Sequence, residues 1–170
     1  LLGEGVEVKM ELDAQLRPVL ADACAVERIL SNFAMNSRDA MPGGGRFTIT
    51  TAVARPSDPL MPEAAGRHAC MTVTDTGCGM DVATKAHLFA PFFTTKPPGK
   101  GTGLGLATVH GIVHRLGGQV LCDSEPGKGT SFQIHLPMVA LREESARVPS
   151  ATPARPAATQ RERILLVAEV

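Results

Sequence analysis

Alternating glycines directly ahead of an apolar helical run constrain this chain more than any other feature. Gly99, Gly101, Gly103 and Gly105 lead into residues 104–116, whose apolar spacing predicts a buried helix. Fixing a glycine in a folded loop costs backbone entropy, so we expect a loop this rich in glycine to hold a ligand. A helix N-terminus presents free N–H groups and the positive end of the helix dipole. The stretch therefore predicts a site for phosphate groups.

Two common phosphate-binding motifs do not fit this stretch. A dinucleotide-binding loop reads G-x-G-x-x-G, whereas the glycines here alternate. A Walker A loop needs Gly-Lys followed by Ser or Thr, but Gly99-Lys100 is followed by Gly101. The remaining interpretation is a short lid at residues 94–100, which closes over phosphates and carries Lys96 and Lys100.

Histidine and cysteine spacing does not favour a metal site built from protein ligands alone. His110 and His114 are four residues apart on the expected helix, but no third ligand accompanies them. The four cysteines form no C-x-x-C pair. We therefore expect free thiols in a reducing compartment, which indicates the cytoplasm.

Length and charge restrict the class of protein. The 170 residues suffice for one domain with a tail. Lys and Arg total 17, and Asp and Glu total 17, so the formal net charge is zero. Such a chain is not expected to bind nucleic acid or an anionic membrane surface. No apolar run in it is long enough to span a bilayer.

Hydrophobic periodicity predicts strands interleaved with helices. Apolar and polar residues alternate, as in strands, at 6–12, 47–53, 69–74, 119–124 and 130–136. A further short strand is expected near residues 18–20. Helical spacing is found at 24–41, 81–88 and 104–116. This order ends on a hairpin and predicts an α/β fold, with one mixed sheet and helices on one face.

Composition divides the chain into three parts. Residues 1–141 carry the periodic elements and a Pro-rich surface loop at 55–67. Residues 142–162 are rich in Ala, Pro, Ser, Thr and charge, which predicts a flexible linker. Residues 163–170 begin with an apolar strand pattern. Because the chain starts at Leu1 without Met, we expect it to be a fragment of a longer protein.

The first expected helix carries polar side chains beside its apolar stripe. Asn32, Asn36 and Asp39 share one side at the 3.6-residue repeat. Asn is disfavoured inside helices, and amide oxygens suit a hard cation such as Mg²⁺ that is carried by phosphates. A solvated helix face is the alternative. The apolar stripe consists of Val26, Ile29, Leu30, Phe33, Ser37, Ala40 and Met41.

A carboxylate and two glycines follow the strand expected at 69–74. Asp75, Gly77 and Gly79 form the pattern D-x-G-x-G. A carboxylate at a strand end accepts hydrogen bonds, and the glycines let a ligand approach the backbone. The exocyclic amino group of adenine is a fitting donor, whereas the guanine carbonyl would be repelled. An ordinary tight turn is the alternative.

Five segments in this order resemble the conserved boxes of histidine-kinase catalytic domains. Residues 32–41 (NFAMNSRDAM) resemble the N box, and residues 75–80 (DTGCGM) the G1 box. Residues 88–96 (LFAPFFTTK) resemble the F box, and residues 99–106 (GKGTGLGL) the G2 box. Residues 127–132 (GKGTSF) match the usual last motif. The resemblance covers about residues 4–138 and is nearest to the nitrogen-regulation type of sensor kinase.

This resemblance implies the Bergerat fold, a two-layer α/β sandwich, and a site for ATP with Mg²⁺. Motif matching implies catalytic roles for Asn32, Asn36 and Lys96, with Asn36 as the Mg²⁺ ligand. Asp75 would accept a hydrogen bond from the adenine amino group. The residues implied in cofactor binding are Asn36, Asp39, Asp75, Gly77, Gly79, Lys96, Gly101, Thr102, Gly103, Leu104, Gly105, Leu106 and Thr130.

The residue at position 32 separates two branches of this superfamily. Hydrolytic members carry a Glu there that activates water, and Asn32 is a poor general base. The resemblance therefore implies transfer of the γ-phosphoryl group of ATP to a histidine in two-component signalling. A non-catalytic ATP-binding regulatory module and a hydrolytic ATPase are the alternatives.

The partners follow from what the chain lacks. None of its five histidines lies in a phosphoacceptor motif, so a dimerisation hairpin that carries the acceptor is expected before Leu1. A response regulator or receiver domain is the other implied partner. The fragment is expected to be monomeric, in a parent kinase that forms a homodimer and can be membrane-tethered. Residues 163–169 resemble the first strand of a receiver domain, as in a hybrid kinase, but Ala168 stands where an acid is usual.

Overall fold

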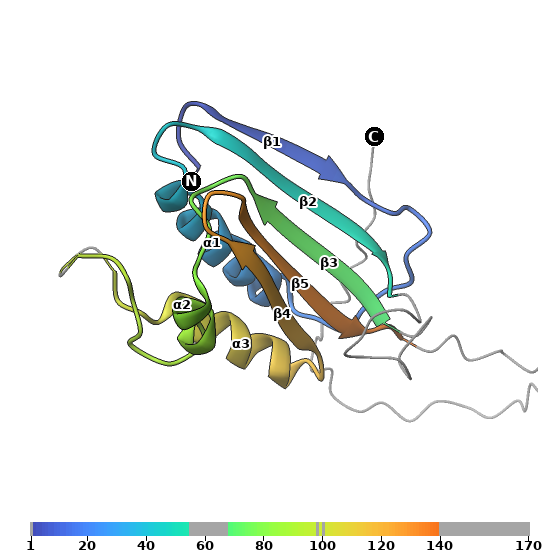
Figure 1. Ribbon diagram of the computed structural model, residues 1–170. Coiled ribbons are helices and arrows are strands. Elements are labelled where there is room, and N and C mark those ends of the chain that lie inside the picture. The colour runs from blue at the N-terminus through green and yellow to red at the C-terminus, as the bar shows by residue number, and fades with distance from the viewer. Residues whose placement is uncertain (1, 55–67, 98, 100, 140–170) are drawn as a thin grey trace, which may run out of the picture.

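Five strands form one mixed sheet in the part of the chain that the structure describes (Figure 1). The structure is a computed structural model, and it describes residues 2–54, 68–97, 99 and 101–139. The strands are β1 (Val6–Glu11), β2 (Gly45–Val53), β3 (His68–Asp75), β4 (Gln119–Glu125) and β5 (Gly129–Pro137). Their order across the sheet is β1-β2-β3-β5-β4. β1 runs parallel to β2, and every other neighbouring pair is antiparallel.

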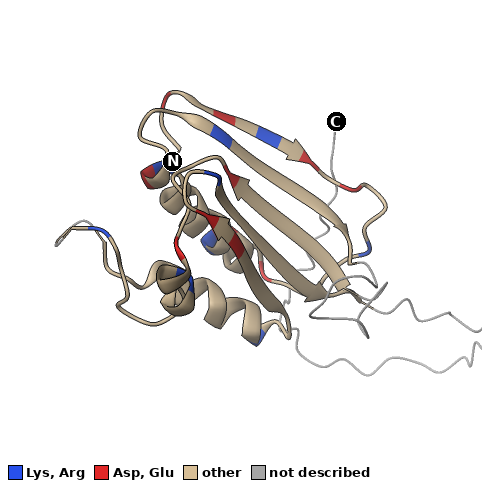
Figure 2. Ribbon diagram, in the orientation of Figure 1, with Lys and Arg blue, Asp and Glu red and all other residues tan. Residues whose placement is uncertain are grey.

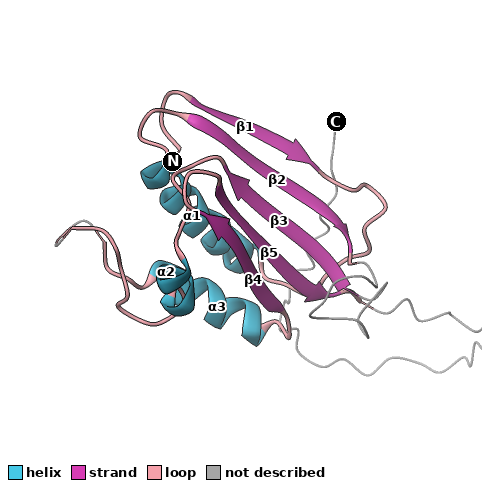
Figure 3. Ribbon diagram, viewed as in Figure 1, coloured by secondary structure: helices cyan, strands magenta, loops and turns pink. Residues whose placement is uncertain are grey.

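The helices of the described ranges lie on one face of this sheet (Figures 1 and 3). They are α1 (Ala23–Ala40), α2 (Val82–His87) and α3 (Gly105–Arg115). The core lies between the two layers, where Phe33 of α1 stacks on Phe132 of β5 with ring centroids 4.6 Å apart. Every second residue of β3 is buried, as expected for a strand with one face on a core. The predicted two-layer α/β fold is confirmed.

The expected elements agree with the structure, with one difference. Near residues 18–20 there is no strand, only an isolated bridge between Val19 and Met138. Pro18 precedes this bridge and has no N–H to continue a ladder. The expected loop at 55–67, the linker at 142–162 and the strand at 163–170 lie outside the described residues. The three-part division of the chain therefore stays a prediction.

Charge distinguishes the edge of the sheet from its interior. The edge strand β1 alternates Glu and Lys, whereas the inner strand β5 carries no charged side chain (Figure 2). Charges on an edge strand discourage pairing with other chains. The inner strand β5 already pairs with β3 on one side and with β4 on the other. No helix in the described ranges is long and apolar enough to cross a bilayer.

Helix termini in the described ranges differ in how they are capped. Asp22 caps α1 by accepting a hydrogen bond from the Cys24 amide at 3.0 Å, and Asp81 caps α2 by accepting from the Thr84 amide at 2.7 Å. At the start of α3, Leu104 provides no side-chain cap. The first N–H groups of α3 are therefore left for another acceptor.

Candidate functional site

A cavity of about 780 Å³ lies beside α1, the end of β3, the segment after α2 and the start of α3. Its walls contain every residue that the motifs predicted for the site, with the exception of Gly77. Four stretches of the sequence, including Thr130 and Phe132 of β5, thus meet around one space. The predicted residues on its walls are Asn32, Asn36, Asp39, Asp75, Gly79, Lys96, Gly101, Thr102, Gly103, Leu104, Gly105, Leu106 and Thr130.

Gly77 lies behind the cavity wall and contacts Asp75. Its amide donates a hydrogen bond to Asp75 Oδ1 at 2.9 Å. A Cβ at this position would lie 2.7 Å from the Ala40 Cβ, so a larger residue would separate the turn from α1. Gly77 therefore orients Asp75 and does not itself line the space.

Asp75 is the buried acid of the cavity, with only 5% of its surface exposed. Its second oxygen, Oδ2, accepts a hydrogen bond from Ser37 Oγ on α1 at 2.8 Å. Both carboxylate oxygens thus accept from the protein, one from a helix and one from the following turn. A buried carboxylate needs such donors, and the remaining lone pairs can accept from a ligand.

Thr130 lines the cavity and pairs with Asp75 across neighbouring strands, and Ser124 bonds to it from outside the lining. Ser124 Oγ lies 3.0 Å from Thr130 Oγ1, accepts from the Met80 amide at 2.9 Å and donates to the Gly129 carbonyl at 2.9 Å. This network ties the turn after β3 to the β4–β5 hairpin. We call the region of Asp75, Gly79, Met80 and Thr130 the Asp75 end of the cavity.

Gly79 is required where the turn meets the hairpin. Its φ is +67°, and a Cβ there would lie 1.9 Å from the Glu125 carbonyl oxygen. Both the left-handed conformation and the close approach exclude a side chain. The motif glycine therefore allows the turn to pack tightly at the Asp75 end.

The start of α3 lies directly against the asparagines of α1. A Cβ on Gly105 would lie 2.8 Å from Asn32 Oδ1 and 3.9 Å from Asn36 Nδ2. Asn32 Nδ2 donates to the Arg28 carbonyl at 2.7 Å, one turn earlier in the helix. Glycine is thus needed for the close approach, which brings the uncapped N–H groups of α3 beside two amide side chains.

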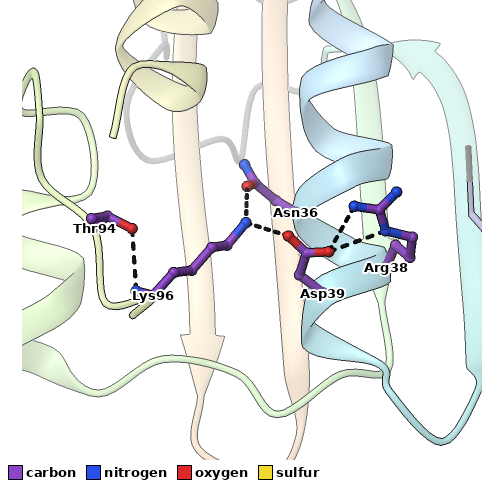
Figure 4. A network of polar contacts seen from close by, with 5 residues as sticks. All are labelled: Asn36, Arg38, Asp39, Thr94 and Lys96. Carbon is purple, nitrogen blue, oxygen red and sulfur yellow. Dashed lines mark hydrogen bonds and ion pairs between the residues drawn. The ribbon is translucent and has the colours of Figure 1, made fainter. Parts of the chain in front are cut away.

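Lys96 connects the segment after α2 to α1 (Figure 4). Its Nζ lies 2.5 Å from Asp39 Oδ2 and 3.3 Å from Asn36 Oδ1. On the other side of the carboxylate, Arg38 donates to Asp39 Oδ1 through Nη2 at 2.9 Å and Nε at 3.1 Å. The hydrogen bond from Lys96, helped by Arg38 and opposed by partial burial, holds the pKa of Asp39 below its ordinary value. We call the region of Asn36, Asp39 and Lys96 the Lys96 end.

The two ends suit different parts of a ligand. At the Lys96 end, cations and helix N–H groups favour an anion, and the cavity lining as a whole also includes Arg28 and Arg38. The Asp75 end includes Met80, and the cavity lining also carries the apolar side chains of Leu88, Phe93 and Phe132. A cavity with an apolar half and an anion-binding half fits a nucleotide.

Motif reasoning missed two contacts of this site. Ser37 belongs to the apolar stripe predicted for the first helix. A polar side chain within that stripe is the one sequence signal that indicates a buried hydrogen bond. The Lys96–Asp39 ion pair joins residues 57 positions apart, and no local pattern indicated it. Asp39, which the motifs predict to bind the cofactor, lines the cavity, and its two oxygens contact Lys96 and Arg38. On α3, the His110 ring stacks on His114 and lies tilted against Phe89, with ring centroids 6.4 and 5.2 Å away. The described residues contain no group of three metal-ligating side chains.

Comparison with known proteins identifies the family of this chain. Residues 21–140 match the family described as histidine kinase-, DNA gyrase B- and HSP90-like ATPase. Sensor kinase CckA of Brucella abortus is 41% identical over 157 residues, which cover 89% of this chain and 16% of CckA. The histidine-protein kinase AtoS of Escherichia coli is 32% identical over 133 residues, covering 78% of this chain and 20% of AtoS. This chain thus spans a fifth or less of these two relatives.

Solved structures show the same fold. A mycobacterial sensor histidine kinase, MprB, superposes with a TM-score of 0.62 at 27% identity, covering 79% of this chain and 83% of that one. Full-length ShkA in complex with AMPPNP gives a TM-score of 0.64 at 29% identity, covering 79% of this chain and 26% of ShkA. The chain therefore belongs to the histidine kinase-, DNA gyrase B- and HSP90-like ATPase family, as the ATP-binding catalytic domain of a sensor histidine kinase.

Proposed function

We propose that this chain binds Mg-ATP and donates the γ-phosphoryl group to a histidine on a separate dimerisation hairpin. The observation that carries the proposal is the polarity of one cavity. A buried hydrogen-bond acceptor, Asp75, lies at one end, and an ammonium group with two amide side chains lies at the other. The adenine base fits the first end and the triphosphate the second.

The Lys96 end has the donor set that Mg²⁺ prefers. Asn36 Oδ1 and Asp39 Oδ2 both lie within reach of a single ammonium nitrogen, at 3.3 and 2.5 Å. The amide oxygen of Asn36 thus already faces positive charge, and Mg²⁺ is held in proteins by few oxygen ligands together with substrate phosphates. Asn36 would be its ligand from this chain. Bound Mg²⁺ would neutralise charge on the phosphates.

Transfer of a phosphoryl group requires positioning and charge stabilisation more than covalent chemistry. Lys96 and the N–H groups of α3 would orient the phosphates, while Asp75 would fix the base. The acceptor nitrogen forms a bond to the γ-phosphorus as the bond to the β-phosphate oxygen breaks, and ADP leaves. Asp39 would hold Lys96 at the phosphates through its ion pair.

The carboxylates of the cavity wall support transfer over hydrolysis. Among the described residues that line it, the acids are Asp39 and Asp75. Asp39 is paired with Lys96 and Arg38, and Asp75 accepts from Ser37 and Gly77. Neither is available as a base beside the phosphates, where Asn32 lies instead. A general base for water is thus lacking at that position.

The partners of this reaction are the phosphoacceptor hairpin and a response regulator or receiver domain. We propose that the parent kinase is a homodimer, because transfer requires the hairpin that such kinases use to dimerise. We also propose that the fragment is monomeric and that its location is cytoplasmic. These partners also determine the test of the function.

The test uses radiolabelled ATP with the parent's hairpin added in trans. Label should move from the γ-phosphate to the hairpin in the presence of Mg²⁺, and free phosphate should appear slowly without the hairpin. Rapid phosphate release without the hairpin would favour a hydrolytic ATPase. Tight ATP binding with no labelled hairpin would favour the regulatory module.

A further inference from the structure

Ser37 contacts Asp75 from behind the cavity wall and does not itself line the cavity. Only 3% of its surface is exposed. Its Oγ donates to Asp75 Oδ2 at 2.8 Å across 38 positions of sequence. The contact is thus a buried side-chain bond between the helix layer and the sheet layer.

This direction of donation is unusual for a serine within a helix. A helical serine commonly donates to a backbone carbonyl of the preceding turn. Here the hydroxyl donates to a carboxylate on β3, and the positions around it on the same face, Phe33 and Ala34, are buried and apolar. Burying a hydroxyl among apolar side chains is unfavourable unless it has a hydrogen-bond acceptor, and Asp75 Oδ2 supplies that acceptor.

The two internal donors fix the plane of the Asp75 carboxylate. The Gly77 amide holds Oδ1 and the Ser37 hydroxyl holds Oδ2. Two fixed points on a planar group leave it no rotation about its terminal torsion. The lone pairs that remain are acceptors with set directions. Asp75 can then receive a donor from the cavity at one angle and repel an acceptor there.

We infer that Ser37 is a positioning residue that determines the selectivity of this site for 6-aminopurine nucleotides. The inference rests on the proposed function, in which Asp75 accepts from the base. Ser37 acts through Asp75: without the hydroxyl, the carboxylate rotates and its hydrogen bond to the amino group weakens. A 6-oxopurine is then repelled less, because the carboxylate can turn away from the carbonyl.

The test compares ligands that differ only at position 6 of the purine. Binding of ATP, of inosine triphosphate, which has a 6-oxo group, and of purine riboside triphosphate, which lacks the 6-amino group, is measured by calorimetry on the 170-residue chain. Ser37→Ala should weaken ATP about fivefold and leave the analogue without the amino group within about twofold. The preference for ATP over inosine triphosphate should narrow. A general packing defect would weaken all three ligands equally.

Two further variants serve as controls. Ser31→Ala makes the same chemical change on α1, at a residue that does not line the cavity, and should change nothing. Ser37→Thr keeps a hydroxyl and should restore the preference for ATP. Thermal unfolding of each variant identifies any loss of folded protein.

Two outcomes separate this inference from the function beneath it. Equal binding of ATP and the analogue by the unmodified chain would contradict the contact between Asp75 and the base, and the inference with it. If the unmodified chain prefers ATP to the analogue and Ser37→Ala keeps that preference in full, the role of Ser37 is overturned, whereas the contact between Asp75 and the base is not.

Discussion

The two ends of the cavity are held by different kinds of interaction. At the Asp75 end, a carboxylate that is 5% exposed accepts hydrogen bonds from a hydroxyl and an amide. At the Lys96 end, the side chains of Lys96 and Asp39 are 31% and 32% exposed and form an ion pair. Salt screens exposed ion pairs but hardly affects buried hydrogen bonds. The first end is therefore rigid and selective, and the second is adjustable and sensitive to salt.

The anchoring of the two ends follows the same division. The Asp75 end belongs to β3, which pairs with β2 and β5 in the middle of the sheet. The Lys96 end joins α1 to a segment between α2 and α3 that lies away from the sheet (Figure 1). Positions 98 and 100 of the expected lid lie outside the described residues. Because the two ends are anchored differently, substitutions at the Asp75 end should change recognition of the base, and substitutions at the Lys96 end should change binding of the phosphates.

The largest expected effect is at the Lys96 end. Asn36→Ala removes the amide oxygen proposed to hold Mg²⁺ and should lower transfer to the hairpin by roughly a hundredfold or more. Transfer of radiolabel at saturating ATP measures it, with Ser31→Ala as the matched control on the same helix. A variant that transfers at the normal rate would refute the role of Asn36.

The next effect is at the Asp75 end. Asp75→Asn replaces an acceptor with an amide and should weaken ATP binding by about 1.5–3 kcal/mol, the range for a hydrogen bond to a charged group. Calorimetry measures the change, which should be nearly the same at low and high salt because the contact is buried. Unchanged affinity would contradict the contact with the base.

A smaller effect is expected from the lysine itself. Lys96→Met keeps the length of the side chain but removes its charge, and should weaken ATP binding about fivefold at low salt. The loss should shrink at about 1 M salt, where the Debye length is roughly 3 Å. A loss that is independent of salt would mean that Lys96 acts through packing, and the contrast between the two ends would not hold.

The smallest effect concerns Asp39 and pH. Its pKa is held below the ordinary value of 3.8, mainly by the hydrogen bond from Lys96. A lowered pKa means that the ionised carboxylate stabilises the folded state above about pH 4, and that this contribution is lost as the pH falls through the folded-state pKa. Asp39→Asn should thus cost a few tenths of a kcal/mol at pH 7, since the pair is partly exposed.

Urea unfolding of Asp39→Asn and the unmodified chain at pH 7 and pH 3 checks this expectation. The difference in unfolding free energy should be smaller at the lower pH. A difference that stays constant between the two would show that the ion pair contributes nothing to stability.

Most of the elements could be predicted because their causes are local. The alternation in residues 69–74 and the 3.6-residue stripe from Val26 to Met41 each reflect one buried face, and the structure places β3 and α1 there. The strand expected near residues 18–20 was wrong because the pattern is too short to define a partner. Pairing also depends on the backbone of residues more than a hundred positions away.

The sequence by itself determined which residues line the cavity. Each motif keeps the same few side chains and glycines next to one another, wherever the fold places that segment. It also determined the two-layer class, because strand and helix periodicities must bury their apolar faces against each other. Only the tertiary structure decided which side chains hold those residues in place. Ser37 meets Asp75, and Lys96 meets Asp39, across 38 and 57 positions of sequence. Such contacts are decided by how helix and sheet pack, and no local pattern encodes them.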